Sequence, residues 1–204
     1  METVKKMEST IGGRWRGVSL FYSDYEKWKK YLSPPVERFC ETFDSTDLST
    51  RLLDPGKFTC PGASYAFGYG EGIKQDMVRK FVDEKGYSSK YAENLINETP
   101  HCTDQLKAIG IDLDKQPDVL IAKLQPEQIM KLIDIYQKVL EKAFTCELTS
   151  VISLCANIAI KTTQTNDLTI SFGCEDARTA GNLSRDRLFA GLPYTLATTM
   201  MKEF

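Results

Sequence analysis

The sequence is poor in histidine and has no excess of basic residues. Its 204 residues include one histidine, and 26 Lys and Arg residues face 28 Asp and Glu residues, which gives a net charge of −2 and a pI of ≈ 5.6. Proteins that bind nucleic acid or anionic membranes neutralise negative charge with an excess of Lys and Arg. The composition therefore argues against both kinds of partner.

Long apolar runs are also missing. The longest uncharged stretches, residues 58–70, 148–160 and 188–201, are shorter than the ~20 apolar residues that a spanning helix needs. Residues 1–13 contain Lys5 and Lys6, but no apolar segment of the kind found in a secretory signal follows them. We therefore expect a cytoplasmic protein that does not enter a membrane.

The length and the patterning predict one domain. Hydrophobic residues at 42% are enough for a sizeable core in an ordinary globular protein. We expect a lead-in over residues 1–16 and a single domain over residues 17–204. Strand-like and helix-like patterns both occur, which predicts an α/β fold, with a mixed α+β arrangement as the other option.

Local patterns predict the main elements. Strand patterns cover residues 17–22, 57–60, 119–122 and 168–172. Helix patterns with start or stop signals cover residues 36–43, 73–85, 89–96, 126–143 and 195–204, and further short helices are expected to begin at Pro61 and after Cys174. Residues 68–72 are glycine-rich and predict a turn, because they lack the spacing of a phosphate-binding loop.

Six cysteines are many for a cytoplasmic protein, where a reducing environment makes disulfides rare. None of them belongs to a C-x2-C pair, so the usual signal of a zinc ribbon or a thioredoxin-like motif is missing. Metal binding, thiol chemistry or simple burial must explain them. They are Cys40, Cys60, Cys102, Cys146, Cys155 and Cys174.

The pattern Phe-x-Cys-x-x-Ala-x-x-Ala occurs twice, from Phe58 and from Phe172. A second cysteine precedes each copy at nearly the same distance, and an apolar strand pattern precedes each pair. We interpret this as an old duplication, with halves at about residues 17–98 and 117–204 related by a pseudo-two-fold axis. That packing would gather four cysteines and leave Cys102 and Cys146 apart; the alternative is that free cysteines only fill the core. The four are Cys40, Cys60, Cys155 and Cys174.

An ordered set of motifs resembles a known prokaryotic family, domain of unknown function 169 (DUF169), over nearly the whole chain from about Gly17. The resemblance implies the fold of that family and its cysteine set, at Cys40, Cys60, Cys155 and Cys174. It implies no reaction, because the activity of the family is not established. One departure precedes Cys155, where Val151-Ile152 replaces a glycine-arginine pair. The motifs are Arg38-Phe39-Cys40-Glu41, Phe58-Thr59-Cys60-Pro61-Gly62-Ala63, Pro117-Asp118-Val119-Leu120 with the helix from Pro126, Ser171-Phe172-Gly173-Cys174 with Arg178 and Gly181, and Gly191-Leu192-Pro193.

Four thiolates match the soft-ligand preference of Zn²⁺ and of iron–sulfur clusters. Structural zinc usually takes ligands from close pairs, whereas each of these cysteines lies on its own element. The spacing therefore favours an iron–sulfur cluster, of the [4Fe–4S] type, over zinc or no metal. Helix starts after Cys60 and Cys174 would supply amide donors to the sulfurs.

Three further residues are expected close to this site. Phe58 and Phe172 each precede a cysteine by two positions and would shield the cluster from water. The charges of Glu175 and Asp176 require compensation, for which Arg178 is the nearest candidate, with Arg185 and Arg187 as others.

Such a cluster predicts a role in electron transfer, in sensing or in support of an anaerobic reaction, with a redox partner protein or a small ligand. Two alternatives stay open: an enzyme with one activated cysteine, and a sensor module that binds a small ligand without metal. An activated thiol needs a base or a cation beside it. The only histidine, His101, adjoins Cys102, but neighbours in sequence rarely face each other. Nothing in the pattern indicates an oligomeric state.

Overall fold

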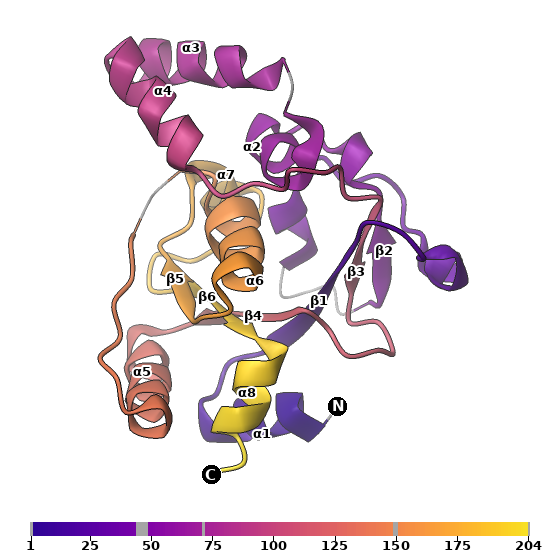
Figure 1. The fold of residues 1–204 in the computed structure, drawn as a ribbon, viewed down its shortest axis with the longest axis vertical. Helices are drawn as coiled ribbons and strands as arrows, with labels where there is room; N and C mark the ends of the chain where they lie inside the picture. Colours follow the sequence, from indigo (N-terminus) through magenta and orange to yellow (C-terminus); the bar gives the residue numbers. More distant parts are fainter. Residues whose placement is uncertain (1, 44–48, 71, 149–150, 204) are drawn as a thin grey trace.

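The fold is built on one six-stranded sheet with helices on both faces (Figure 1). The structure is a computed structural model, and it describes residues 2–43, 49–70, 72–148 and 151–203. The strand order is β2-β3-β1-β4-β6-β5, and all pairings between these strands are antiparallel. The fold is therefore mixed α+β, the second of the two expected classes. The strands are β1 (Trp15–Phe21), β2 (Arg51–Leu53), β3 (Ala108–Ile111), β4 (Val119–Leu124), β5 (Thr169–Ser171) and β6 (Leu188–Pro193).

The strand order is the same in the two parts of the chain. β1 and β4 pair at the centre, with Val18 opposite Val119. Beside β1 lies β3, and β2 forms that edge of the sheet; beside β4 lies β6, and β5 forms the other edge. In both parts the order from the centre is therefore first, third and second strand. β3 lies between the two predicted halves, beyond residue 98 and before residue 117. The pseudo-two-fold relation itself stays a prediction, which a superposition of the two parts tests.

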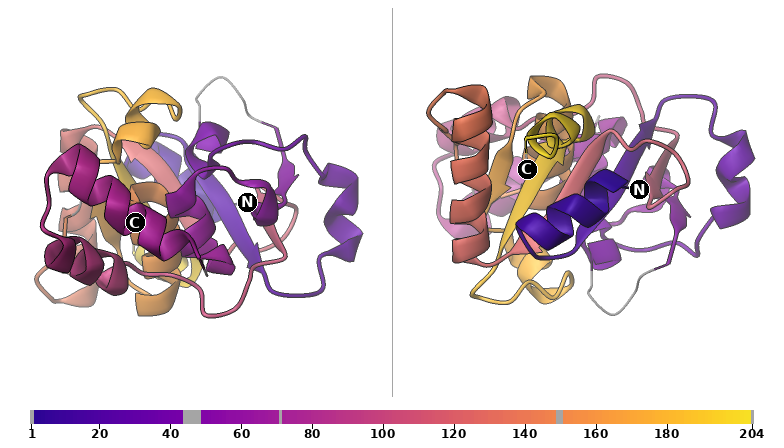
Figure 2. Two further views of the ribbon diagram at one scale, coloured as in Figure 1. Left: turned by 90° about the horizontal axis from the view of Figure 1, so that it is seen from above. Right: turned by 90° about the horizontal axis from the view of Figure 1, so that it is seen from below.

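The helices form two layers. α1, α5 and α8 pack on one sheet face (Figure 2), and η2, α2 and η5, which contain or directly follow a cysteine, pack on the other. Strand β4 shows why, because Val119 and Ile121 belong to one buried cluster and Leu120 and Ala122 to the other. The α-helices are α1 (Glu2–Thr10), α2 (Pro61–Ser64), α3 (Ile73–Lys85), α4 (Ser89–Glu98), α5 (Pro126–Leu140), α6 (Lys161–Thr165), α7 (Glu175–Thr179) and α8 (Tyr194–Met200). The 3-10 helices are η1 (Glu26–Tyr31), η2 (Phe39–Phe43) and η3 (Pro55–Lys57), and the π-helices are η4 (Tyr65–Tyr69) and η5 (Ser153–Ile160).

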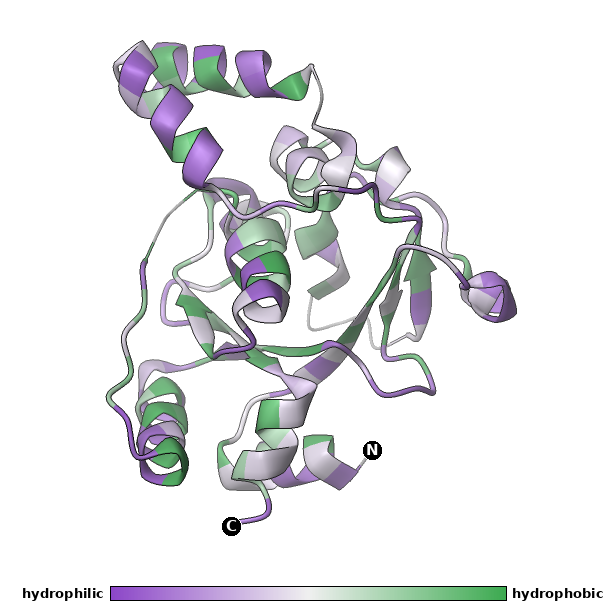
Figure 3. Cartoon of the chain, viewed as in Figure 1, coloured by the Kyte–Doolittle hydropathy of each residue, from purple (hydrophilic) through white to green (hydrophobic). Residues whose placement is uncertain are grey.

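Helices α3 and α4 form the predicted hairpin, which projects from the rest of the fold and carries many hydrophilic residues (Figure 3). Gly86 ends α3 in the left-handed conformation, at φ +69°, which glycine adopts without strain. The Ser88 side chain then accepts a hydrogen bond from the Tyr91 N–H and starts α4. Of the described helices, none is long and apolar enough to span a membrane.

Two predicted elements differ around Glu37. Its carbonyl accepts hydrogen bonds from the N–H groups of Thr59 and Cys60, at 3.0 and 3.2 Å. This carbonyl is therefore not used for a regular helix over residues 36–43, and only the short η2 forms. Residues 57–60 form no strand, because the N–H groups of Lys57 and Phe58 donate to the carbonyls of Asp54 and Pro55 and those of Thr59 and Cys60 share the Glu37 carbonyl. The terminal helix is also shorter than predicted, and Phe204 lies outside the described residues.

Candidate functional site

The four cysteines of the repeated pattern lie on one side of the sheet: Cys40 and Cys155 belong to one buried cluster, and the partly buried Cys60 and Cys174 pack against it. Each is a free thiol. Burial, followed by the neighbouring Cys174 and Cys60, raises the pKa of Cys40 to about 12. Burial also raises the pKa of Cys155 well above its usual value, with contributions from Cys60, Cys174 and Cys40. This mutual influence shows that the fold gathers these four thiols into one electrostatic neighbourhood.

Each cysteine comes from a different element. Cys40 lies in η2 and its thiol donates to the Asp176 carbonyl at 3.6 Å. Cys60 and Cys174 are the residues directly before α2 and α7, as predicted. Cys155 lies inside η5, whose residues are all buried. The site therefore draws two cysteines from each part of the chain.

Backbone amides point toward two of the sulfurs. Burial raises the pKa of Cys60, while the nearby backbone N–H groups of Ala63 and Gly62 act in the opposite direction. The N–H of Ala156 does the same for Cys155. These donors stabilise negative charge on sulfur, as the first turn of a helix does for an anion.

Close packing at Gly181 brings η2 against the end of α7. A methyl group at Gly181 would lie 2.6 Å from the Ala177 carbonyl oxygen and 3.0 Å from the Cys40 Cβ. Only a glycine fits here, and Cys40 owes its position beside α7 to this contact.

The charges around the cysteines are paired, but not by the arginine expected from the sequence. Arg38 lies 3.3 Å from Asp176, and Lys85 of α3 lies 3.0 Å from Glu175. Arg178 instead donates to the carbonyl oxygens of Ser184 and Phe172. Its side chain fixes the loop around α7 and does not compensate the acidic pair.

The two phenylalanines of the repeat have different environments. Phe58 is buried and its ring packs against Phe39 and Phe67. Phe172 is 47% exposed, so a shielding role for its ring stays a prediction with less support than that of Phe58. The reason is the positive φ of Gly173, +83°, which turns the chain between Phe172 and Cys174 and breaks the strand alternation that would put both on one face.

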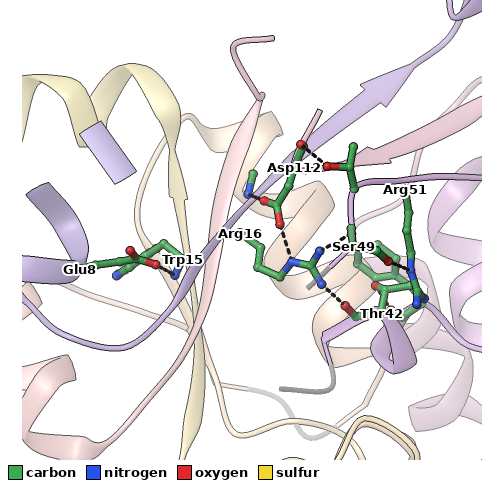
Figure 4. A network of polar contacts seen from close by, with 10 residues as sticks. Glu8, Trp15, Arg16, Thr42, Ser49, Arg51 and Asp112 are labelled. Carbon is green, nitrogen blue, oxygen red and sulfur yellow. Dashed lines mark hydrogen bonds and ion pairs between the residues drawn. The ribbon is translucent and has the colours of Figure 1, made fainter. Parts of the chain in front are cut away.

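An ion pair between a buried arginine and a partly exposed aspartate holds the Cys40 segment to the sheet (Figure 4). Arg16 of β1 lies 2.7 Å from Asp112 and donates to the Thr42 and Ser49 carbonyls at 2.7 and 2.9 Å. The second Asp112 carboxylate oxygen accepts the Gly17 N–H. Thr42 belongs to η2, so Arg16 fixes the backbone that presents Cys40. No sequence pattern indicated this contact between distant residues.

A cavity of about 300 Å³ adjoins three of the cysteines, Cys60, Cys155 and Cys174. Met77 and Phe81 of α3 line it together with Val151 and Ile152. No sequence pattern predicted this cavity, because the residues of α3 are distant in the chain from the other residues that line it. Charged and small residues complete the lining: Pro61, Gly62, Lys80, Glu84, Lys85, Glu175, Asp176 and Thr179.

The remaining cysteines, Cys102 and Cys146, do not line this cavity, although Cys102 belongs to the same buried cluster as Cys40 and Cys155. Their separation from the site stays a prediction. The Cys102 thiol accepts a hydrogen bond from the Tyr22 hydroxyl at 3.4 Å. Cys146 packs on the opposite sheet face and lies 3.5 Å from the Ile170 carbonyl. His101 stacks on Tyr65 and its Nδ1 lies 3.0 Å from the Thr99 carbonyl, so it forms no pair with Cys102.

The donor set of the site is soft, with four thiols in surroundings of low polarity. Within the ranges that the structure describes, no group of three or more His, Cys, Asp or Glu side chains is arranged to hold a single metal ion. Zinc bonds of ~2.3 Å would require the sulfurs to crowd around one point.

The sequence matches the family DUF169, described as "Uncharacterised ArCR", over residues 17–203. The chain belongs to this family. No curated protein and no solved structure gives a significant match. The DUF169 match begins within β1 and ends after α8, so it includes all four cysteines and the cavity.

Proposed function

We propose that Cys40, Cys60, Cys155 and Cys174 bind an iron–sulfur cluster, of the [4Fe–4S] type, which serves electron transfer, sensing or support of an anaerobic reaction. The observation that carries the proposal is the grouping of four thiols from four elements in one buried neighbourhood. A cytoplasmic location, with a reducing environment, would keep these thiols available for iron. A redox partner protein would exchange electrons with the cluster, or a small ligand would bind beside it.

A cluster accounts for this donor set better than a single ion does. In a four-iron cluster each cysteine binds a different iron, so the sulfurs lie farther apart than around zinc. Cysteines on four separate elements suit this wider spacing, whereas structural zinc favours close pairs.

The surrounding residues suit a cluster in three ways. The N–H groups of Gly62, Ala63 and Ala156 would donate to sulfur, which influences the reduction potential of a cluster. Arg38 offsets the charge of Asp176. The buried ring of Phe58 would exclude water. When bound, the cluster supplies one-electron transfer.

The alternative of an enzyme with one activated cysteine has less support. A nucleophilic thiol needs a lowered pKa. Burial raises the pKa of Cys40, Cys60, Cys102 and Cys155 instead. A raised pKa keeps the thiols of these cysteines protonated, which does not favour their use as nucleophiles.

The test is the metal and sulfide content of protein purified without oxygen. The proposal predicts about four irons and four acid-labile sulfides per chain, with absorption that bleaches on reduction. Zinc in the absence of sulfide would contradict the cluster and indicate a structural zinc site instead. Metal-free protein with one fast-alkylating thiol would support the thiol enzyme.

A further inference from the structure

We propose that the cavity beside Cys60, Cys155 and Cys174 binds a small, uncharged, largely apolar molecule. The inference deepens the proposed function, because such a ligand would touch residues that we assign to the cluster. It concerns the chain itself, however, and it can be tested on protein without metal.

The size and the walls of the cavity determine the class of ligand. Its volume of about 300 Å³ lies at the lower end of the range for small-molecule sites. Met77 and Phe81 come from α3, and Val151 and Ile152 come from the turn before η5. These apolar side chains from two separate segments suit a ligand of one to three aromatic rings.

The charged residues at the cavity disfavour an anion. Lys80 has Glu84 as its partner at 3.8 Å, and Lys85 has Glu175 at 3.0 Å. Asp176 is paired with Arg38. Both lysines in the described lining are thus already paired, and thiolates bound to a cluster would add further negative charge. An anionic ligand would have to break an ion pair, whereas an uncharged one would not.

The turn at Ile152 supports a ligand role for the same wall. Ile152 has φ +45°, a conformation that a β-branched residue rarely adopts. The Asn157 side-chain amide donates to the carbonyls of both Val151 and Ile152, at 3.1 and 3.2 Å, and holds the turn in place. Strained backbone of this kind persists where surrounding contacts enforce it, and it gathers at ligand sites. Here it keeps the Ile152 side chain on the cavity wall, against Gly62.

The experiment uses two fluorescent probes with the same ring skeleton. N-phenyl-1-naphthylamine is uncharged, and 8-anilinonaphthalene-1-sulfonate adds one sulfonate. Metal-free, fully reduced protein is titrated with each. We expect saturable binding of the uncharged probe at one site per chain, and binding of the sulfonate at least about tenfold weaker. Absence of saturable binding, or equal affinity for both probes, would overturn the inference.

A matched pair of variants locates the probe. Phe81→Ala removes a ring from the cavity wall and should weaken binding about tenfold. Tyr91→Ala removes an exposed ring from α4 of the same hairpin, outside the cavity, and should leave the affinity within about twofold. Circular dichroism confirms that both variants fold. Equal affinities in the two variants would place the probe elsewhere and refute the site.

Alkylation by iodoacetamide provides a second readout. The uncharged probe should slow alkylation of Cys60 and Cys174, which line the cavity, while Cys146 on the other sheet face serves as the internal control. Equal protection of all three thiols would contradict specific binding. Protein that binds the probe but takes up no iron would refute the proposed cluster and leave this inference standing.

Discussion

The guanidinium of Arg38 lies 3.3 Å from the carboxylate of Asp176, and this contact joins the segment before Cys40 to the helix after Cys174. Asp176 also accepts hydrogen bonds from two cysteines, through its carbonyl from Cys40 and through its carboxylate from Cys60. One arginine therefore balances the acidic residue that two of the four proposed ligands contact.

Replacing Arg38 should weaken metal retention. Arg38→Met keeps most of the side-chain length but leaves the Asp176 carboxylate uncompensated beside negatively charged sulfur. We expect iron to be lost about tenfold faster to a chelator, in line with the effect of residues next to metal ligands. Arg79→Met, which breaks an exposed ion pair on α3, is the control and should match the wild type. Equal rates in the two variants would show that Arg38 has no part in the site.

Gly181→Ala tests the close packing behind Cys40. The added methyl group would overlap the Ala177 carbonyl and press on the Cys40 Cβ. We expect a loss of about 1–3 kcal/mol in the free energy of unfolding, as for other overpacked sites. Urea denaturation measures this loss. A fully stable variant would mean that η2 and α7 can separate without cost.

Asp112→Asn tests the ion pair that anchors η2. Asp112 has φ +51°, a conformation that asparagine tolerates, so the variant changes charge with little change in backbone strain. Loss of the charge leaves the Arg16 guanidinium, with a side chain 5% exposed, without its carboxylate. We expect destabilisation of about 2 kcal/mol, since Asp112 is partly exposed. The double variant Arg16→Met/Asp112→Asn should recover part of this loss, and a further loss instead would contradict the account.

Local signals in the sequence were enough for several elements. Gly86 and Ser88 end α3 and begin α4, and Pro61 begins α2, because these signals act within one turn of the chain. The positions of Cys60 and Cys174 before their helices followed from the same signals.

Contacts between distant segments could not be predicted. The Glu37 carbonyl is taken by Thr59 and Cys60, which shortens the helix around Cys40. Asp176 pairs with Arg38 from the other part of the chain, where sequence proximity favoured Arg178. Strands β2 and β5 have three residues each, too few for their edge positions to be read from periodicity.

Stability in acid should depend on Asp167. Burial alone would raise its pKa, but hydrogen bonds from Tyr136 at 2.6 Å and Lys142 at 3.0 Å lower the pKa of this carboxyl below its usual value. A lowered folded-state pKa stabilises the protein above the unfolded value of about 3.9, and the contribution is lost as the pH falls through the folded pKa.

Asp167→Asn should therefore lower the free energy of unfolding at neutral pH by on the order of 1 kcal/mol, after allowance for its partial exposure. The difference from the wild type should shrink toward about pH 2. Thermal unfolding at both pH values measures it, with the exposed Asp114→Asn as the control. A difference that does not change with pH would assign the effect to packing instead of charge.

The central claim is that four particular cysteines share one cluster, and the most direct test is the iron and sulfide content of single Cys→Ser variants purified without oxygen. The account predicts that substitution of Cys40, Cys60, Cys155 or Cys174 removes most of the iron and sulfide, while Cys102→Ser and Cys146→Ser keep the wild-type content. Retention of the full content after any of the first four substitutions, or its loss on changing Cys146, would contradict the assignment.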